Sequence, residues 1–93
     1  MNSGQVAAIL ARHGIGADAD PAALVAALGV RGWRFVTEEG RPVSRSPRWH
    51  AVAWRTVPGS ASGIPFRQTL RAIKPTEAAA LAELLAKALE REP

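Results

Sequence analysis

The chain contains no cysteine among its 93 residues, and this absence excludes several classes of chemistry. No disulfide, thiolate nucleophile or cysteine-ligated zinc or iron–sulfur site can form. The sequence also lacks a run of about 18 apolar residues, the length that a membrane-spanning helix needs. No basic flank precedes an apolar stretch at the N-terminus, as an export signal would require. We therefore expect a cytoplasmic protein that has no contact with a membrane.

Residue patterns typical of catalysis or metal binding are also missing. The two histidines, His13 and His50, have no carboxylate at the spacing that accompanies a metal pair. Glu38 and Glu39 are adjacent, so in a strand their carboxylates point to opposite faces and cannot act together as acid and base. The serines of the predicted loops have no base beside them. We expect no enzymatic activity, no metal and no cofactor.

What is present suits a single small domain spanning residues 1–93, with an apolar content of 47%. A chain of this size can bury about 60% of the surface that it exposes when unfolded. Apolar side chains recur at helical spacing in residues 4–13, with Ser3 as a candidate N-cap. A second helix is expected over residues 21–28, because Asp20 can cap its N–H groups and a proline follows. We expect this helix to stop at Gly29.

The middle of the chain predicts three strands. Residues 33–39, 49–57 and 64–72 are rich in β-branched and aromatic side chains and are bounded by glycine, proline and serine. The connecting segments 40–47 and 58–63 suit a long hairpin loop and a flexible turn. The strands should therefore follow one another in an antiparallel meander.

The last segment predicts the clearest helix. Pro75 ends the third strand, Thr76 is a suitable N-cap, and Glu77 suits the positive end of the helix dipole. Apolar residues then recur at helical spacing, namely Ala78, Leu81, Leu84, Leu85 and Leu89. Such a stripe must pack on an apolar surface. We therefore predict an α+β fold, α-α-β-β-β-α, in which the C-terminal helix and one or two short N-terminal helices pack on one face of a three-stranded antiparallel sheet.

The positive charge is concentrated in the predicted sheet. The chain carries a formal net charge of +4, to which residues 1–30 contribute −1 and residues 75–93 contribute −2. Residues 31–74 carry nine basic and two acidic side chains, a net charge of +7. Strand alternation places Arg67 and Arg71 opposite the apolar face of the third strand. We therefore predict that one face of the sheet is covered and the other is exposed and positive.

The second strand leaves two interpretations open for its tryptophans. Trp54 shares a face with Val52 and His50, whereas Trp49 shares the other face with Arg55. Trp49 is either exposed among arginines or hidden by a bulge or an edge position. On the same pattern, we expect His50 to be half-buried beside Val52 and Trp54.

An exposed tryptophan among arginines suits a nucleic-acid surface, because guanidinium groups neutralise phosphates and an indole ring stacks on bases. The alternative explanation is that the arginines only confer solubility and the tryptophans only fill the core. Our leading hypothesis is a small non-catalytic binding module whose basic sheet face and 40–48 loop contact nucleic acid. The predicted contact residues are Arg34, Arg45, Arg48, Trp49, Arg55, Arg67 and Arg71.

A protein partner is the rival hypothesis. The same face could bind an acidic protein surface, as in a phage-borne inhibitor that acts on a host complex. The domain could also dimerise with a second copy along an exposed sheet edge. Binding to nucleic acid at low salt would separate these hypotheses.

Three segments carry a resemblance to a known group of proteins. They are Gly32-Trp33-Arg34, Arg48-Trp49-His50-Ala51-Val52-Ala53-Trp54-Arg55 and Pro75-Thr76-Glu77-Ala78-Ala79-Ala80-Leu81. Over roughly residues 20–91, the chain resembles small phage and prophage proteins of unknown function that form an αβββα sandwich. The resemblance implies a three-stranded antiparallel sheet packed by helices, a gene carried on a mobile element, and no catalytic residues to transfer.

The succession of helices and strands is also similar to that of double-stranded-RNA-binding domains. That family has a cluster of basic lysines at the start of its final helix. This chain has Thr76, Glu77 and Ala78 there instead. RNA binding through that helix is therefore not expected.

Overall fold

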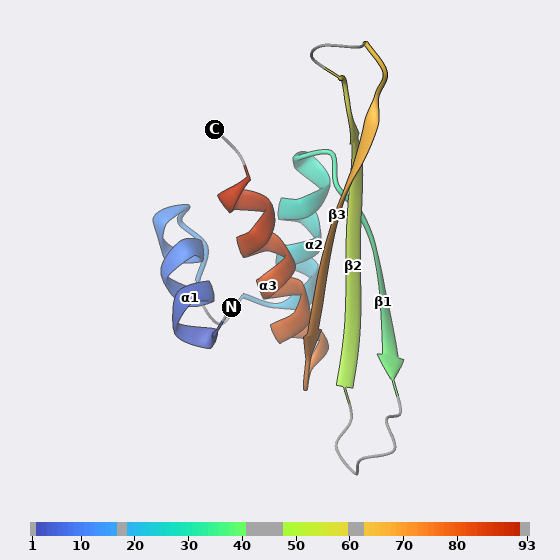
Figure 1. The fold of residues 1–93 in the computed structure, drawn as a ribbon. Helices are drawn as coiled ribbons and strands as arrows, with labels where there is room; N and C mark the ends of the chain where they lie inside the picture. The colour runs from blue at the N-terminus through green and yellow to red at the C-terminus, as the bar shows by residue number, and fades with distance from the viewer. Residues whose placement is uncertain (1, 17–18, 41–47, 60–62, 92–93) are drawn as a thin grey trace.

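The computed structural model describes residues 2–16, 19–40, 48–59 and 63–91. Within these residues the elements are α1 (Ser3–Arg12), α2 (Pro21–Val30), β1 (Arg34–Gly40), β2 (Arg48–Val57), β3 (Phe66–Lys74) and α3 (Glu77–Glu90). The strands form an antiparallel sheet in the order β1-β2-β3. All three helices lie on one side of this sheet, which confirms the predicted fold (Figure 1). In the described ranges, no helix has the length and apolarity to cross a membrane.

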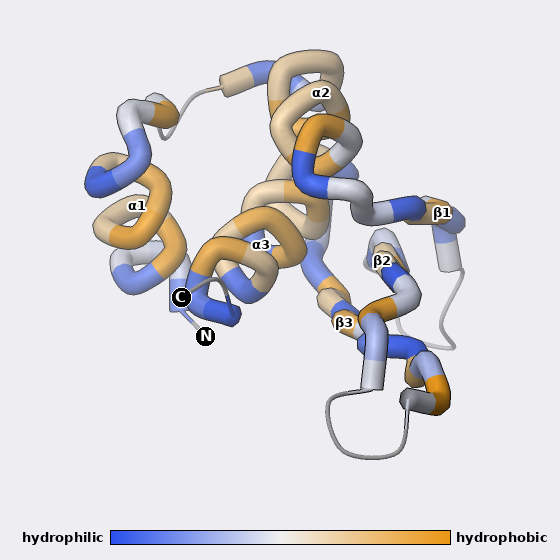
Figure 2. The backbone as a smooth tube through the Cα atoms, turned by 90° about the horizontal axis from the view of Figure 1, so that it is seen from above, coloured by the Kyte–Doolittle hydropathy of each residue, from blue (hydrophilic) through white to orange (hydrophobic). Residues whose placement is uncertain are grey.

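The helix α3 lies at the centre of the fold. It packs on β2 and β3, and α2 packs beside it on the same side of the sheet. The helix α1 packs on α3 from the side away from the sheet (Figures 1 and 2). Because α3 has neighbours on several sides, its buried residues are not confined to one stripe. They are Ala80, Leu81, Glu83, Leu84, Leu85, Ala86, Ala88 and Leu89.

Small residues form much of the sheet surface beneath α3. Ala51 and Ala53 of β2 and Ala72 of β3 are all buried, together with Leu70. A small side chain on the sheet lets the helix come close to the strand backbone, which increases dispersion contacts between the two layers. The alanines therefore mark the face of the sheet that the helices cover.

The helix N-termini are capped by side chains. Asn2, rather than the predicted Ser3, caps α1, because its side chain accepts a hydrogen bond from the Gln5 N–H at 2.8 Å. The Gln5 side chain accepts one from the Asn2 N–H at 3.0 Å, which completes a capping box. Asp20 and Thr76 cap α2 and α3, as predicted.

The helix α2 ends at Val30 and not before Gly29, so the predicted stop was wrong. The Trp33 N–H donates to the Leu28 carbonyl at 3.2 Å, and the Gly32 N–H donates to the Gly29 carbonyl at 3.0 Å. This is the Schellman pattern, and Gly32 has the left-handed φ of 80° that the pattern requires. The motif directs the chain out of α2 so that Trp33 enters the core just before β1 begins.

A charged residue, Glu83, is buried on α3. Its carboxylate oxygens lie 3.5 Å from Lys74 Nζ and 3.6 Å from Lys87 Nζ. Lys87 Nζ also donates a hydrogen bond to the backbone carbonyl of Arg71 at 2.6 Å. These contacts connect α3 to β3, which is an edge strand of the sheet.

We expect Glu83→Ala to lower the free energy of unfolding by about 1–3 kcal/mol, because two partly buried ammonium groups lose their compensating charge. The cost stays below that of a fully buried pair, since both lysines can turn toward water. Urea denaturation measures the change. Glu90→Ala, at an exposed site on the same helix, is the control and should change the free energy by less than about 0.5 kcal/mol. Equal effects of the two substitutions would contradict the role of Glu83.

Candidate nucleic-acid interface

In the described part of the chain, the side of the sheet opposite the helices is uncovered (Figures 1 and 2). Trp54 pairs with Arg34 of β1 and with Thr69 of β3, and paired residues share a face. We call this side the outer face. Its residues are Arg34, Val36, Glu38, Arg48, His50, Val52, Trp54, Thr56, Arg67, Thr69, Arg71 and Ile73.

The outer face combines basic and apolar side chains. It carries four arginines and one glutamate. None of these arginines forms an ion pair with a carboxylate among the residues that the structure describes. Val36 and Ile73 are 53% and 51% exposed, and Val52 and Trp54 are half-buried. The face is therefore positive at its arginines and apolar between them.

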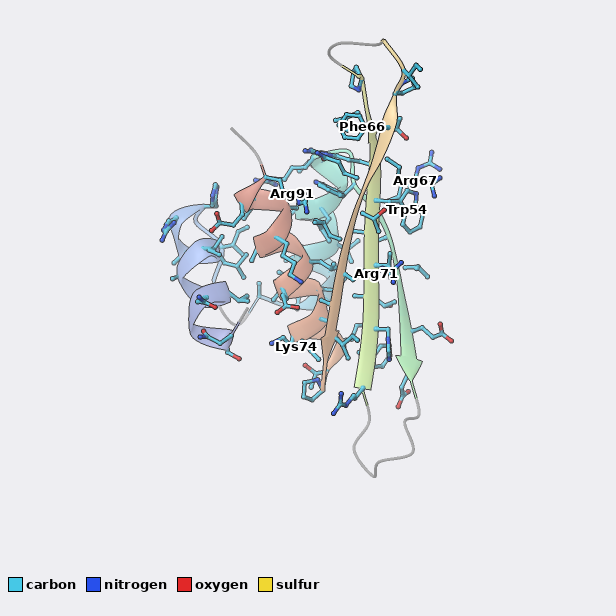
Figure 3. The ribbon with its side chains drawn as sticks, in the orientation of Figure 1. Trp54, Phe66, Arg67, Arg71, Lys74 and Arg91 are labelled. Atoms are coloured by element: carbon cyan, nitrogen blue, oxygen red, sulfur yellow. The ribbon has the colours of Figure 1, made fainter. Side chains whose placement is uncertain are left out.

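Trp54 lies among three of these arginines. Arg34 is directly opposite it on β1, and Arg67 and Arg71 flank its partner on β3. Diagonal neighbours of this kind are about 7–8 Å apart, within reach of long side chains. Figure 3 shows Trp54 and Arg67 on the side of the sheet away from the helices. The register thus builds a basic cluster around an aromatic ring.

A hollow of about 380 Å³ opens at the end of the sheet where β1 begins, beside the outer face. The strand β2 continues to Val57, three residues beyond its pairing with Arg34, so its edge is not covered by β1 there. The hollow is lined by Gly32, Arg34, Trp54, Arg55, Thr56 and Arg67. Three arginines and a tryptophan beside one opening suit an anionic ligand that carries an aromatic group.

Arg55 reaches this hollow from the covered face of β2. Its Nε donates a hydrogen bond to Gln68 Oε1 at 2.9 Å, and its guanidinium carbon lies 4.5 Å from the centroid of the Trp33 ring. Trp33 is only 3% exposed, so this ring is a fixed support. The two contacts hold the guanidinium group in one orientation before any ligand arrives.

The structure brings together some of the predicted contact residues and separates others. Arg34, Arg67 and Arg71 lie around Trp54 on the outer face. Arg48 is on the same face but near the other end of β2, roughly 20 Å from Trp54 by the rise of a strand. The cluster at the start of β1 therefore forms without Arg48.

Trp49 is not on the outer face. It pairs with Glu39 and Lys74 and packs, half-buried, against the core on the helix side. The strand β2 is central, so strand alternation hides Trp49 without a bulge or an edge position. Trp54, which the prediction did not include, occupies the outer position instead. Arg45 lies outside the described residues, as does the rest of segment 41–47.

His50 also differs from its prediction. It is exposed on the outer face, between Glu38 of β1 and Ile73 of β3, because no described element covers this side of the sheet. Over the described ranges, no group of three or more histidine, cysteine, aspartate or glutamate side chains could hold a metal ion. The described part of the outer face therefore offers cationic and aromatic side chains rather than a set of metal ligands.

No protein-family model matches the chain, and the comparisons with curated proteins and with solved structures find no match either. The fold and the site themselves define the class. It is a small α+β domain with helices on one face of a three-stranded sheet and arginines around a tryptophan on the other. Because a fold of this kind does not specify a function, the chemistry of that face does.

Proposed function

We propose that the protein is a small non-catalytic module that binds nucleic acid through its outer face. The observation that carries the proposal is the cluster of Arg34, Arg67 and Arg71 around Trp54 on the outer face of the sheet. These guanidinium groups have no ion pairs within the described residues, so phosphates can take that place and release their counterions.

The distribution of charge between the two sides of the protein also favours the outer face as the side that binds nucleic acid. The outer face carries four arginines and one glutamate, whereas residues 75–93 carry a net charge of −2. A polyanion that approaches the protein is therefore attracted more strongly to the outer face than to the helices. Arginine is also well suited to phosphates, because its planar donors form paired hydrogen bonds.

Salt-dependent binding tests this proposal. We expect the Arg67→Ala, Arg71→Ala double variant to reduce the slope of log affinity against log salt by about 1.4 on single strands or about 1.8 on duplex, the loss of two phosphate contacts. Arg12→Ala removes an exposed arginine from α1, beyond α3, and should leave the slope unchanged. Fluorescence anisotropy of labelled oligonucleotides gives both slopes. If the wild-type protein binds no nucleic acid at low salt, the proposal is wrong and an acidic protein surface becomes the partner to test.

Self-association along the edge of β3 is less favoured as a function. At this edge the Arg71 carbonyl already accepts a hydrogen bond from Lys87 Nζ of α3, so this backbone acceptor is not free to pair with another strand. Carriage by a phage or another mobile element, suggested by the resemblance, stays a prediction. So does a cytoplasmic location.

A further inference from the structure

The shape and polarity of the outer face point to one form of nucleic acid. The major groove of a duplex admits a helix or a two-stranded ribbon, whereas the outer face is three strands wide. A duplex lying on this face would contact it mainly through phosphates and sugars. The exposed apolar surface of Val36 and Ile73, and the ring of Trp54, would then have no apolar partner.

A single strand matches both kinds of side chain at once. Its unpaired bases can stack on an aromatic ring and cover apolar surface, while its phosphates contact arginines. Three residues of the outer face, Trp54, Arg34 and Arg67, line the same hollow. A base and its neighbouring phosphate could therefore be bound side by side.

The hollow also supplies a guanidinium group that is already in position. Arg55 is held by Gln68 at 2.9 Å and by the ring of Trp33 at 4.5 Å. A side chain held in this way loses little conformational freedom when a phosphate binds. The entropic cost of binding is therefore smaller than for a mobile arginine. The fixed guanidinium group of Arg55 therefore makes the hollow a suitable position for the first phosphate.

We infer that the outer face binds single-stranded nucleic acid, with one phosphate in the hollow among Arg34, Arg55 and Arg67 and the adjacent base stacked on Trp54. The inference rests on the proposed nucleic-acid binding and adds the class of ligand and the role of each group. Arg71 lies on β3 two residues from Thr69, the pairing partner of Trp54. We expect it to contact the next phosphate of the bound nucleic-acid strand.

A pair of oligomers separates stacking from charge. One is a short oligothymidylate, and the other has the same number of phosphates but abasic sugars. By anisotropy at low salt, we expect the wild-type protein to bind the oligothymidylate about 5- to 150-fold more tightly, the effect of one stacked base. Trp54→Ala should remove this difference, and Trp54→Phe should keep most of it. Quenching of tryptophan fluorescence by oligothymidylate should weaken in Trp54→Phe, because the stacked indole is gone.

The phosphate subsite has its own variant. Arg55→Gln should weaken binding of both oligomers by the same factor and reduce the salt slope by about 0.7, the value for one phosphate on a single strand. Arg12→Ala is the matched control and should change neither quantity. Circular dichroism confirms that each variant is folded, and Arg67→Gln replaces Arg55→Gln if that variant does not fold.

The outcomes distinguish this inference from the proposed function. Equal wild-type binding of the two oligomers, or tighter binding of a duplex than of a single strand, would overturn the stacking role of Trp54. The proposed function would then still stand if the Arg67→Ala, Arg71→Ala variant lowers the salt slope. Absence of binding to any oligomer at low salt would overturn both.

Discussion

Replacing Leu85 with alanine is expected to lower the free energy of unfolding by about 2–5 kcal/mol. Leu85 is 0% exposed and lies on α3, the helix that contacts β2, β3, α1 and α2. A cavity there cannot close easily, because helices and strands surround the site and each would have to shift. For a domain of this size, the melting temperature should fall by about 10–30 °C.

Thermal and urea denaturation followed by circular dichroism measure this loss. Val30→Ala is the control, because Val30 is bulky and apolar but 80% exposed at the end of α2. It should change the free energy of unfolding by less than about 0.5 kcal/mol. A Leu85→Ala variant with the melting temperature of the wild type would contradict the packing of α3 on the sheet.

Trp33→Ala is expected to cost about 3–5 kcal/mol, the usual range for removing a large buried aromatic side chain. Trp33→Phe should cost much less, since phenylalanine keeps most of the apolar contact area. It also removes the indole N–H, which is buried without a hydrogen-bond partner among the described residues. Urea denaturation of the three proteins gives the order of stability.

The same pair of variants connects the core to the binding site. Arg55 stacks on Trp33, so Trp33→Ala frees a guanidinium group that lines the hollow. In conditions where the variant is folded, its affinity for oligothymidylate should be lower than that of Trp33→Phe, which keeps an aromatic support. Equal affinities of the two folded variants would show that Arg55 does not need this support.

The order of elements could be predicted because its signals are local. Asp20 and Thr76 begin helices through their own side chains, and Pro75 ends a strand through its fixed backbone angle. The apolar stripe of the last helix requires a covered sheet face, so the layering follows as well. The strand boundaries differ from the prediction by one or two residues, since strand ends depend on pairing partners.

The side of the sheet on which β2 places its tryptophans was not predictable from residue size. Strand alternation puts Trp49 and Trp54 on opposite faces of β2, and either side chain is large enough to fill a core. The useful signal is the small residues, because Ala51 and Ala53 pair with Ala72 and Leu70 beneath α3. Close approach of the helix selects alanine at these positions, which puts Trp54 outside. The sequence did not predict the hollow either, because the hollow forms where β2 extends beyond the first residue of β1, and such an overhang depends on the strand register.

The hydrogen bond from Lys87 to the Arg71 carbonyl has a consequence for behaviour at high concentration. A bare strand edge is a template on which identical chains add and grow into fibrils. At β3 this template is interrupted, because the Lys87 side chain of α3 binds the backbone carbonyl of Arg71. The Arg71 side chain still lies on the outer face. The outer face can therefore present exposed apolar side chains to a ligand while the β3 edge hinders the addition of a further strand.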